Sequence, residues 1–168
     1  MNHLFCFGLG FSGRALGKSL LYDGWRVSGT TRNPEKLEVL EQEGFEVYFF
    51  PGEECLIEDQ ISSTTHLVIT IPPQVIGDIV IKEYSKIIAQ GKNLRWLGYL
   101  SSTGVYGNRD GGWVDETLDV APSNERNLLR LEAENRWLGL GKNFGVGVHI
   151  FRAAGIYGPG RNMLEIVK

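Results

Sequence analysis

The sequence has little cysteine and no long hydrophobic run, and each shortage excludes a class of protein. Its two cysteines among 168 residues, Cys6 and Cys55, lie far apart, which argues against a disulfide framework and favours a reducing compartment. No apolar run approaches the length of a membrane span, and the start Met1-Asn2-His3 lacks the basic residues of a signal peptide. We therefore expect a cytoplasmic protein with no membrane partner.

Strong charge and clustered histidine are also missing. A formal net charge of -3 gives no general footprint for nucleic acid or an anionic membrane. The three histidines, His3, His66 and His149, share no ligand spacing, so we expect no metal site. With 42% hydrophobic and 22% charged residues, the chain can bury one ordinary core, which predicts a single domain over residues 1–168.

Apolar strand-like segments alternate with helical ones along the chain. The predicted strands are 4–7, 25–30, 45–50, 66–71, 94–101 and 146–151. The predicted helices are 14–21, 34–43, 75–90 and 124–140, and segment 52–63 is expected to be a turn or a poor helix. This alternation predicts the α/β class, with a Rossmann-type doubly wound parallel sheet and helices on both faces. Ligands of such folds bind at the carboxyl ends of the strands.

A glycine-rich run, Gly8-Leu9-Gly10-Phe11-Ser12-Gly13, follows the first predicted strand directly. Gly8 allows a sharp turn, Gly10 allows close backbone approach to a pyrophosphate, and Gly13 allows the helix to pack against the strand. The amides of Phe11 and Ser12 at the helix start attract phosphate oxygens. We therefore expect a dinucleotide site, although glycine-rich turns also arise for purely conformational reasons.

The end of the second predicted strand bears on the choice of dinucleotide. NAD enzymes usually place a carboxylate there for the ribose 2′-hydroxyl, but this chain has Thr30-Thr31-Arg32. A guanidinium suits a 2′-phosphate, so Thr31 and Arg32 favour NADP over NAD. The alternative is that Arg32 is a solvated loop residue.

Three later strand tips carry further candidate residues. Segment 69–73 ends in Pro72-Pro73, which forces an extended exit beside the cofactor. Segments 100–107 and 151–160 are rich in hydroxyl and glycine residues, which individually also fit turn chemistry. Together with the glycine-rich run and the second strand, these tips complete the predicted cofactor-binding set: Gly8, Gly10, Phe11, Ser12, Gly13, Thr31, Arg32, Ile71, Pro72, Pro73, Ser101 and Ile156.

The sequence resembles the extended short-chain dehydrogenase/reductase superfamily of nucleotide-sugar epimerases and dehydratases, and is nearest to an atypical branch. The motifs that carry the resemblance are the glycine-rich run, Ser101-Ser102-Thr103-Gly104-Val105-Tyr106-Gly107, Trp113-Val114-Asp115-Glu116 and Ile156-Tyr157-Gly158-Pro159-Gly160. The resemblance implies that Ser102 occupies the catalytic Ser/Thr position. It also implies that the turn 155–160 lies beside the nicotinamide.

The chain departs from this family at the catalytic Tyr and Lys. Aligning the family's Ala-Glu pair with Ala133-Glu134 puts Arg126 at the Tyr position and Arg130 at the Lys position. A guanidinium stays protonated at working pH and cannot act as the acid/base. The two arginines, one helical turn apart, can clamp a carboxylate or phosphate. Alternatively, Arg130 pairs with Glu134 on a solvated face.

Two function classes remain open. One is a module that binds NADP(H) with little or no ordinary turnover, and the other is an NADP-dependent reductase or epimerase on a nucleotide sugar or related polar substrate. The predicted substrate-binding residues are Thr103, Tyr106, Arg126, Arg130 and Tyr157. Relatives continue beyond the Tyr-Gly-Pro-Gly turn into a substrate lobe, so we expect this chain to lack most of that lobe.

Self-association is the last expectation. The segments 75–90 and 124–140 carry more apolar surface than one core contact needs, which predicts a homodimer through these helices. The second segment has two apolar stripes, Leu128/Leu131/Leu138 and Leu129/Ala133/Trp137.

Overall fold

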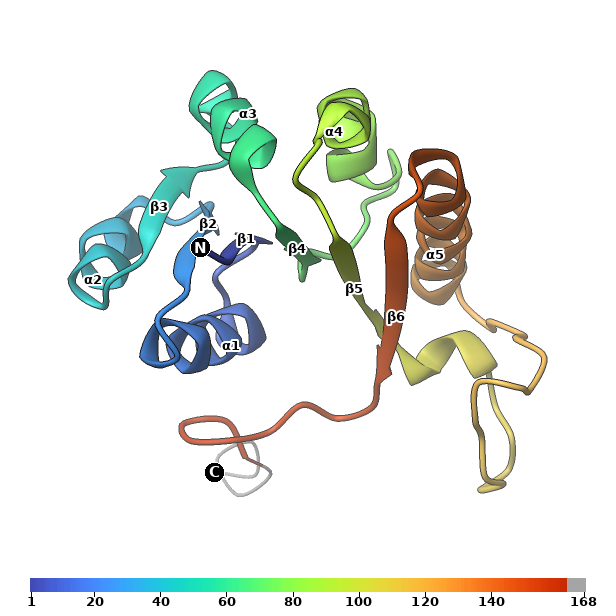
Figure 1. Cartoon of the computed structure of the whole chain (residues 1–168). Coiled ribbons are helices and arrows are strands. Elements are labelled where there is room, and N and C mark those ends of the chain that lie inside the picture. Colours follow the sequence, from blue (N-terminus) through green and yellow to red (C-terminus); the bar gives the residue numbers. More distant parts are fainter. Residues whose placement is uncertain (163–168) are drawn as a thin grey trace.

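A six-stranded parallel sheet forms the centre of the protein (Figure 1). The computed structural model describes residues 1–162. Its strands are β1 (His3–Phe7), β2 (Arg26–Thr31), β3 (Glu46–Phe49), β4 (His66–Ile69), β5 (Trp96–Ser102) and β6 (Gly147–Ala153). Their order is β3-β2-β1-β4-β5-β6, and every pairing is parallel. The predicted Rossmann-type doubly wound sheet is therefore confirmed.

The central strand β1 shows why the sheet is covered on both faces. All five of its residues are buried, as expected for a parallel strand between two layers of helices. Phe5 and Phe7 point into the core beneath one layer, whereas Leu4 and Cys6 point into the other. Alternation along the strand thus supplies both cores.

Helices α1 (Phe11–Tyr22) and α2 (Leu37–Gln42) cover one face of the sheet, and α3 (Glu54–Ser63), α4 (Ile79–Gln90) and α5 (Glu125–Phe144) cover the other (Figure 1). Two short 3-10 helices, η1 (Pro34–Lys36) and η2 (Thr103–Tyr106), complete the elements described for residues 1–162. Within residues 1–162 no helix is long and apolar enough to cross a membrane.

Of the two alternatives for segment 52–63, a turn or a poor helix, the structure has the helix α3 over Glu54–Ser63 and a turn only before it. Its apolar positions Ile57 and Ile61 lie one turn apart and are buried in the larger core. Packing of this pair against the sheet stabilises a helix that local propensity favours only weakly.

Two predicted helices have different ends in the structure. The helix predicted over 75–90 begins at Ile79, because Gln74 and Gly77 form a tight turn and Asp78 caps the first amides through Oδ1. The helix predicted over 124–140 continues to Phe144 and ends at Gly145, which has φ 68°. Left-handed backbone of this kind ends many helices and favours glycine.

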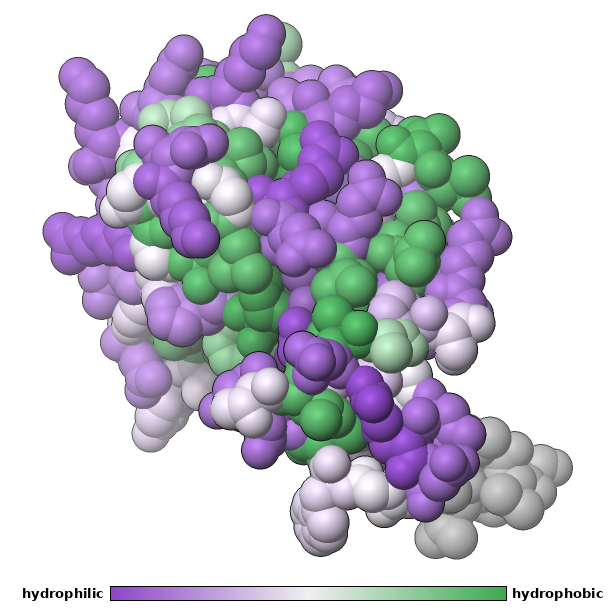
Figure 2. All heavy atoms as spheres, turned by 90° about the vertical axis from the view of Figure 1, so that its right-hand side faces the viewer, coloured by the Kyte–Doolittle hydropathy of each residue, from purple (hydrophilic) through white to green (hydrophobic). Residues whose placement is uncertain are grey.

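Beyond the helices, the face that carries α1 is partly open over β5 and β6. There Trp96 stacks with His149 and contacts Phe151, and the Phe151 side chain is 50% exposed. Figure 2 shows the side of the molecule that carries α5 and β6, with hydrophobic patches between hydrophilic residues. The sheet therefore leaves apolar surface at this edge.

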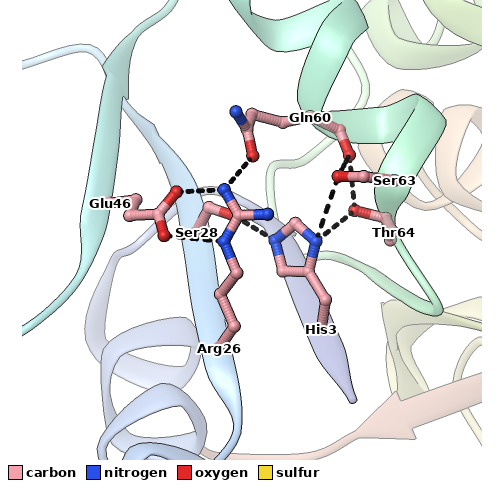
Figure 3. A network of polar contacts seen from close by, with 7 residues as sticks. All are labelled: His3, Arg26, Ser28, Glu46, Gln60, Ser63 and Thr64. Carbon is pink, nitrogen blue, oxygen red and sulfur yellow. Dashed lines mark hydrogen bonds and ion pairs between the residues drawn. The ribbon is translucent and has the colours of Figure 1, made fainter. Parts of the chain in front are cut away.

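A polar network ties together the amino ends of β1, β2 and β3 (Figure 3). The first residues of these strands are His3, Arg26 and Glu46. Arg26 donates to Glu46 over 2.7 Å from Nε to Oε1 and also to Gln60 of α3. The network lies at the edge of the sheet opposite the strand tips that form the predicted site, so it serves the fold.

Candidate functional site

A cavity of about 770 Å³ opens at the carboxyl ends of the strands. It is bounded by the start of α1, the ends of β4 and β5, the first turns of α5 and the segment after β6. The predicted site residues that line it are Gly10, Phe11, Ser12, Ser101, Ser102, Arg126, Arg130, Ile156 and Tyr157. The structure therefore brings the glycine-rich run and two of the predicted strand tips to one place.

The glycine-rich run has the backbone geometry that its spacing predicts. Gly8 has φ +104°, and a Cβ there would lie 2.6 Å from the Thr70 hydroxyl. A Cβ on Gly13 would lie 2.4 Å from the Gly8 carbonyl oxygen, so this glycine permits the helix to approach the strand. Gly10 has open space at its Cβ position and begins α1 without a capping side chain. The start of α1 thus presents backbone amides to the cavity.

The end of β2 holds the glycine-rich run in place. The Gly8 amide donates to the Thr30 hydroxyl over 3.0 Å, and the Leu9 amide donates to the Thr30 carbonyl over 2.8 Å. The Thr31 hydroxyl accepts from the Asn33 amide over 3.2 Å. Arg32 is exposed and makes no ion pair with any residue in 1–162. Its guanidinium is therefore available to a ligand.

The exit of β4 contributes a residue that the sequence prediction did not include. Thr70 lines the cavity, and its hydroxyl donates to the Gly8 carbonyl over 2.7 Å. The Ile71 side chain packs against Gly8. Pro72 and Pro73 lie outside the cavity lining described for residues 1–162. The sequence could have indicated Thr70 as a site residue, because it directly follows the buried strand β4.

At the end of β5 the two serines have different surroundings. The Ser101 hydroxyl is buried and donates to the carboxylate of Glu134. Ser102 is half-buried and lines the cavity. Its hydroxyl accepts from the Gly104 amide over 3.1 Å and so caps the start of η2. Thr103 and Tyr106 follow in η2 and are not part of the cavity lining that the structure describes.

Behind these serines lies a buried ion pair that the sequence prediction missed. Arg152 of β6 donates to both carboxylate oxygens of Glu134, with 2.8 Å from Nη2 to Oε2, and the Glu134 side chain is 1% exposed. Nη1 of Arg152 donates to the Tyr106 hydroxyl over 3.0 Å. The hydrogen bonds to Glu134 are the main cause that raises the pKa of Arg152. A charged residue inside an apolar strand was the signal for this pair.

This pair overturns one expectation for α5. The alternative in which Arg130 pairs with Glu134 on a solvated face is wrong, because Glu134 is buried and pairs with Arg152. Arg130 instead points to the cavity and donates from Nη1 to the Leu100 carbonyl over 3.2 Å. Arg126, one turn earlier, is exposed and also lines the cavity.

The segment after β6 closes the cavity on the side of α1. Ile156 and Tyr157 line it as predicted, and Tyr157 is 82% exposed. Arg161, which the sequence prediction did not include, also lines the cavity, and its guanidinium lies 5.3 Å from the centre of the Phe11 ring. Among residues 1–162 no cluster of His, Cys, Asp or Glu could hold a metal ion.

Comparisons with known proteins identify a protein of similar sequence and solved structures of similar fold. No protein-family model matches the sequence. Protein YeeZ of Escherichia coli (strain K12) is 30% identical over 173 residues, which cover 96% of this chain and 61% of that protein. The structure of a functionally unknown conserved protein from Silicibacter pomeroyi DSS is also similar, with a TM-score of 0.86 and 40% identity. The match covers 96% of this chain and 56% of the Silicibacter pomeroyi chain.

The fold also matches that of a solved epimerase. UDP-glucuronic acid 4-epimerase from Bacillus cereus, in complex with NAD, has a TM-score of 0.70 and 19% identity over 94% of this chain and 58% of that one. At this identity the match establishes the fold alone. The chain spans between 56% and 61% of the length of these three proteins.

Proposed function

The chain has the fold of the extended short-chain dehydrogenase/reductase superfamily, and we propose that it is an NADP(H)-binding protein with little or no ordinary turnover of that superfamily's kind. The observation that carries the proposal is the glycine-rich run at the cavity. Gly10 leaves room above an uncapped helix start, and Arg32 stands exposed beyond the end of β2. Relatives with this fold include a structure in complex with NAD.

The residues present fit a dinucleotide. The first amides of α1 would hold the pyrophosphate, because a helix start combines free N–H groups with a positive dipole end. Arg32 and the Thr31 hydroxyl would hold a 2′-phosphate. The segment with Ile156 would lie beside the nicotinamide, which supplies hydride chemistry when bound.

At the positions of the superfamily's catalytic Tyr and Lys, this chain has the guanidinium groups of Arg126 and Arg130. Arg126 and Arg130 cannot accept a proton at working pH, and Ser102 has no adjacent base among residues 1–162 with which it shares a hydrogen bond. General acid–base catalysis contributes ~10²–10⁴-fold to such reactions. Turnover with the usual substrates is therefore expected to be small.

A cofactor titration tests the proposal. Calorimetry with NADPH and NADH is expected to show tighter binding of NADPH by ~1.5–3 kcal/mol, the usual range for hydrogen bonds to a charged group. Arg32→Ala is expected to remove this preference, whereas Arg95→Ala, which removes an exposed arginine beside the amino end of β5, leaves it intact. Equal affinities for the two cofactors would disprove the NADP assignment, and absence of binding would disprove the proposal.

The second candidate function is an NADP-dependent reductase or epimerase with another proton donor. The observation in its favour is that the hydroxyls of Ser102 and Tyr157 both line the cavity. Nicotinamide absorbance in the presence of NADPH and a panel of nucleotide-sugar ketones separates the candidates. Robust NADPH oxidation that Ser102→Ala abolishes would establish the enzyme and overturn the low-turnover proposal.

A further inference from the structure

Three arginines line one cavity that has no carboxylate in its described lining. Arg126 and Arg130 come from the first two turns of α5, and Arg161 comes from the segment after β6. Within residues 1–162 the remaining lining consists of glycine, hydroxyl, amide and apolar side chains. The cavity therefore has three positive charges and no opposing negative charge from its own described walls.

Three other arginines of the fold are already paired with carboxylates. Arg14 pairs with Glu43, Arg26 with Glu46, and Arg152 with Glu134. By contrast, Arg126, Arg130 and Arg161 form no ion pair with any part of the chain that the structure describes.

The neighbouring carboxylate cannot neutralise these arginines. Glu134 lies one turn beyond Arg130 on α5, but its two oxygens already accept from Arg152 and Ser101. Arg130 uses one N–H for the Leu100 carbonyl, and a guanidinium has five N–H donors. Most donors of Arg130, and those of Arg126, therefore remain for a ligand.

We propose that Arg126 and Arg130 form a binding site for an oxyanion, a carboxylate or a phosphate, of a ligand other than the dinucleotide. The two guanidinium groups lie one helical turn apart on one face of α5 and suit bidentate contacts to such a group. The site lies across the cavity from the start of α1, where the dinucleotide pyrophosphate would bind. The positions that hold the acid/base pair in the superfamily thus serve ligand recognition.

This inference rests on the proposed function, because it assigns the α1 side of the cavity to the cofactor. The occupant therefore has to bind together with NADPH. The chemistry of the two arginines suits an acidic small molecule, such as a sugar acid or a phosphate ester. Arg161, whose guanidinium lies over Phe11 beside the glycine-rich run, stands at the boundary between the two sides.

The test is calorimetry with two probes, inorganic pyrophosphate and malonate, on the protein alone and on the protein saturated with NADPH. At least one probe is expected to bind in both states. Arg126→Gln with Arg130→Gln is expected to weaken that probe by on the order of tenfold or more, as expected from losing charge-assisted hydrogen bonds. NADPH affinity should stay within about threefold, a change under 1 kcal/mol.

Arg136→Gln is the matched control, because Arg136 is exposed on the same helix and outside the described cavity lining. It should leave probe binding unchanged. The decisive state is the protein saturated with NADPH, because the start of α1 is then occupied by the cofactor. Binding of neither probe in that state, or equal probe binding by the double variant, would overturn the inference. If NADPH does not bind but the double variant still loses the probe, the anion site stands and the proposed cofactor function fails.

Discussion

His3 is a buried imidazole whose surroundings suit only its neutral form. It is 3% exposed at the start of β1. The hydroxyls of Ser63 and Thr64 use their protons to donate to the Gln60 carbonyl, so toward Nδ1 of His3 they act as acceptors. Nδ1 therefore carries the ring proton, and Nε2 accepts from the Ser28 hydroxyl (Figure 3). Burial, together with the neighbouring Arg26 cation, lowers the pKa of His3 from 6.5 to about 4.

This lowered pKa predicts a loss of stability in mild acid. As the pH falls below about 6.5, the unfolded chain binds a proton at residue 3 that the folded chain does not bind until about pH 4. The free energy of unfolding should therefore fall across this window, by at most ~3 kcal/mol from this group. The lowered pKa of His66 acts in the same direction. Urea unfolding at several pH values measures the slope.

The variant His3→Gln should flatten this slope, because it removes the titrating group but keeps polar atoms for Ser28 and Thr64. His149→Gln, which removes an exposed imidazole on the edge strand, should have little effect. Identical slopes for the wild-type protein and His3→Gln between pH 4.5 and 6.5 would contradict the assignment.

At the residue scale, the sequence predicted the glycine geometry better than the polar partners. Spacing alone assigned Gly8 to a turn and Gly13 to a close helix contact, because these roles depend on local backbone. The partner of Glu134 could not be predicted in this way. Arg152 lies 18 residues after Glu134, on another element. Arg130 lies four residues before Glu134 on the same helix, a spacing that favours pairing, so the local sequence points to Arg130 as the partner.

The pairing of β6 with α5 depends on the buried ion pair between Arg152 and Glu134. Glu134 also fixes the Ser101 hydroxyl, and Arg152 also contacts Tyr106 of η2. Four elements around the cavity, β5, η2, α5 and β6, therefore share one charged centre. Removing one partner of a buried pair leaves the other charge unpaired, which costs more than the intact pair contributes.

Glu134→Gln is accordingly expected to lower the free energy of unfolding by ~3 kcal/mol, the lower part of the range for broken buried pairs, because Arg152 keeps some contact with solvent. Chemical unfolding measures the change. Glu83→Gln, which breaks an exposed pair with Lys82, should cost no more than ~1 kcal/mol. Similar losses in both variants would show that the buried pair has no special role.

Element existence followed from the sequence, but several boundaries did not. Asp78 begins α4 because its carboxylate is buried, caps two amides and accepts from Trp137 Nε1 over 2.9 Å. Hydrophobic periodicity alone extended that helix to Val75 and Ile76, which are exposed. Likewise, Gly141 does not end α5, since it permits contact with Val148 of β6.

At the scale of the whole molecule, α5 has one apolar stripe inside and one outside. Ala133 and Trp137 are buried in the larger core. Leu128 and Leu138 of the other stripe are 57% and 39% exposed, and Val75 and Ile76 before α4 are also exposed. The predicted homodimer through these two helices would bury this surface.

We expect sedimentation at micromolar concentration to show a dimer, because exposed leucines on one helical face gain free energy when a second copy covers them. Leu128→Glu with Leu138→Glu places charge in that contact and should weaken association by ~10-fold or more, equivalent to ~1.4 kcal/mol. Phe151→Ser is the control, because it removes an exposed apolar side chain from β6, outside the predicted helix contact. A wild-type monomer, or a dimer that Phe151→Ser dissociates and the leucine variant does not, would contradict assembly through α4 and α5.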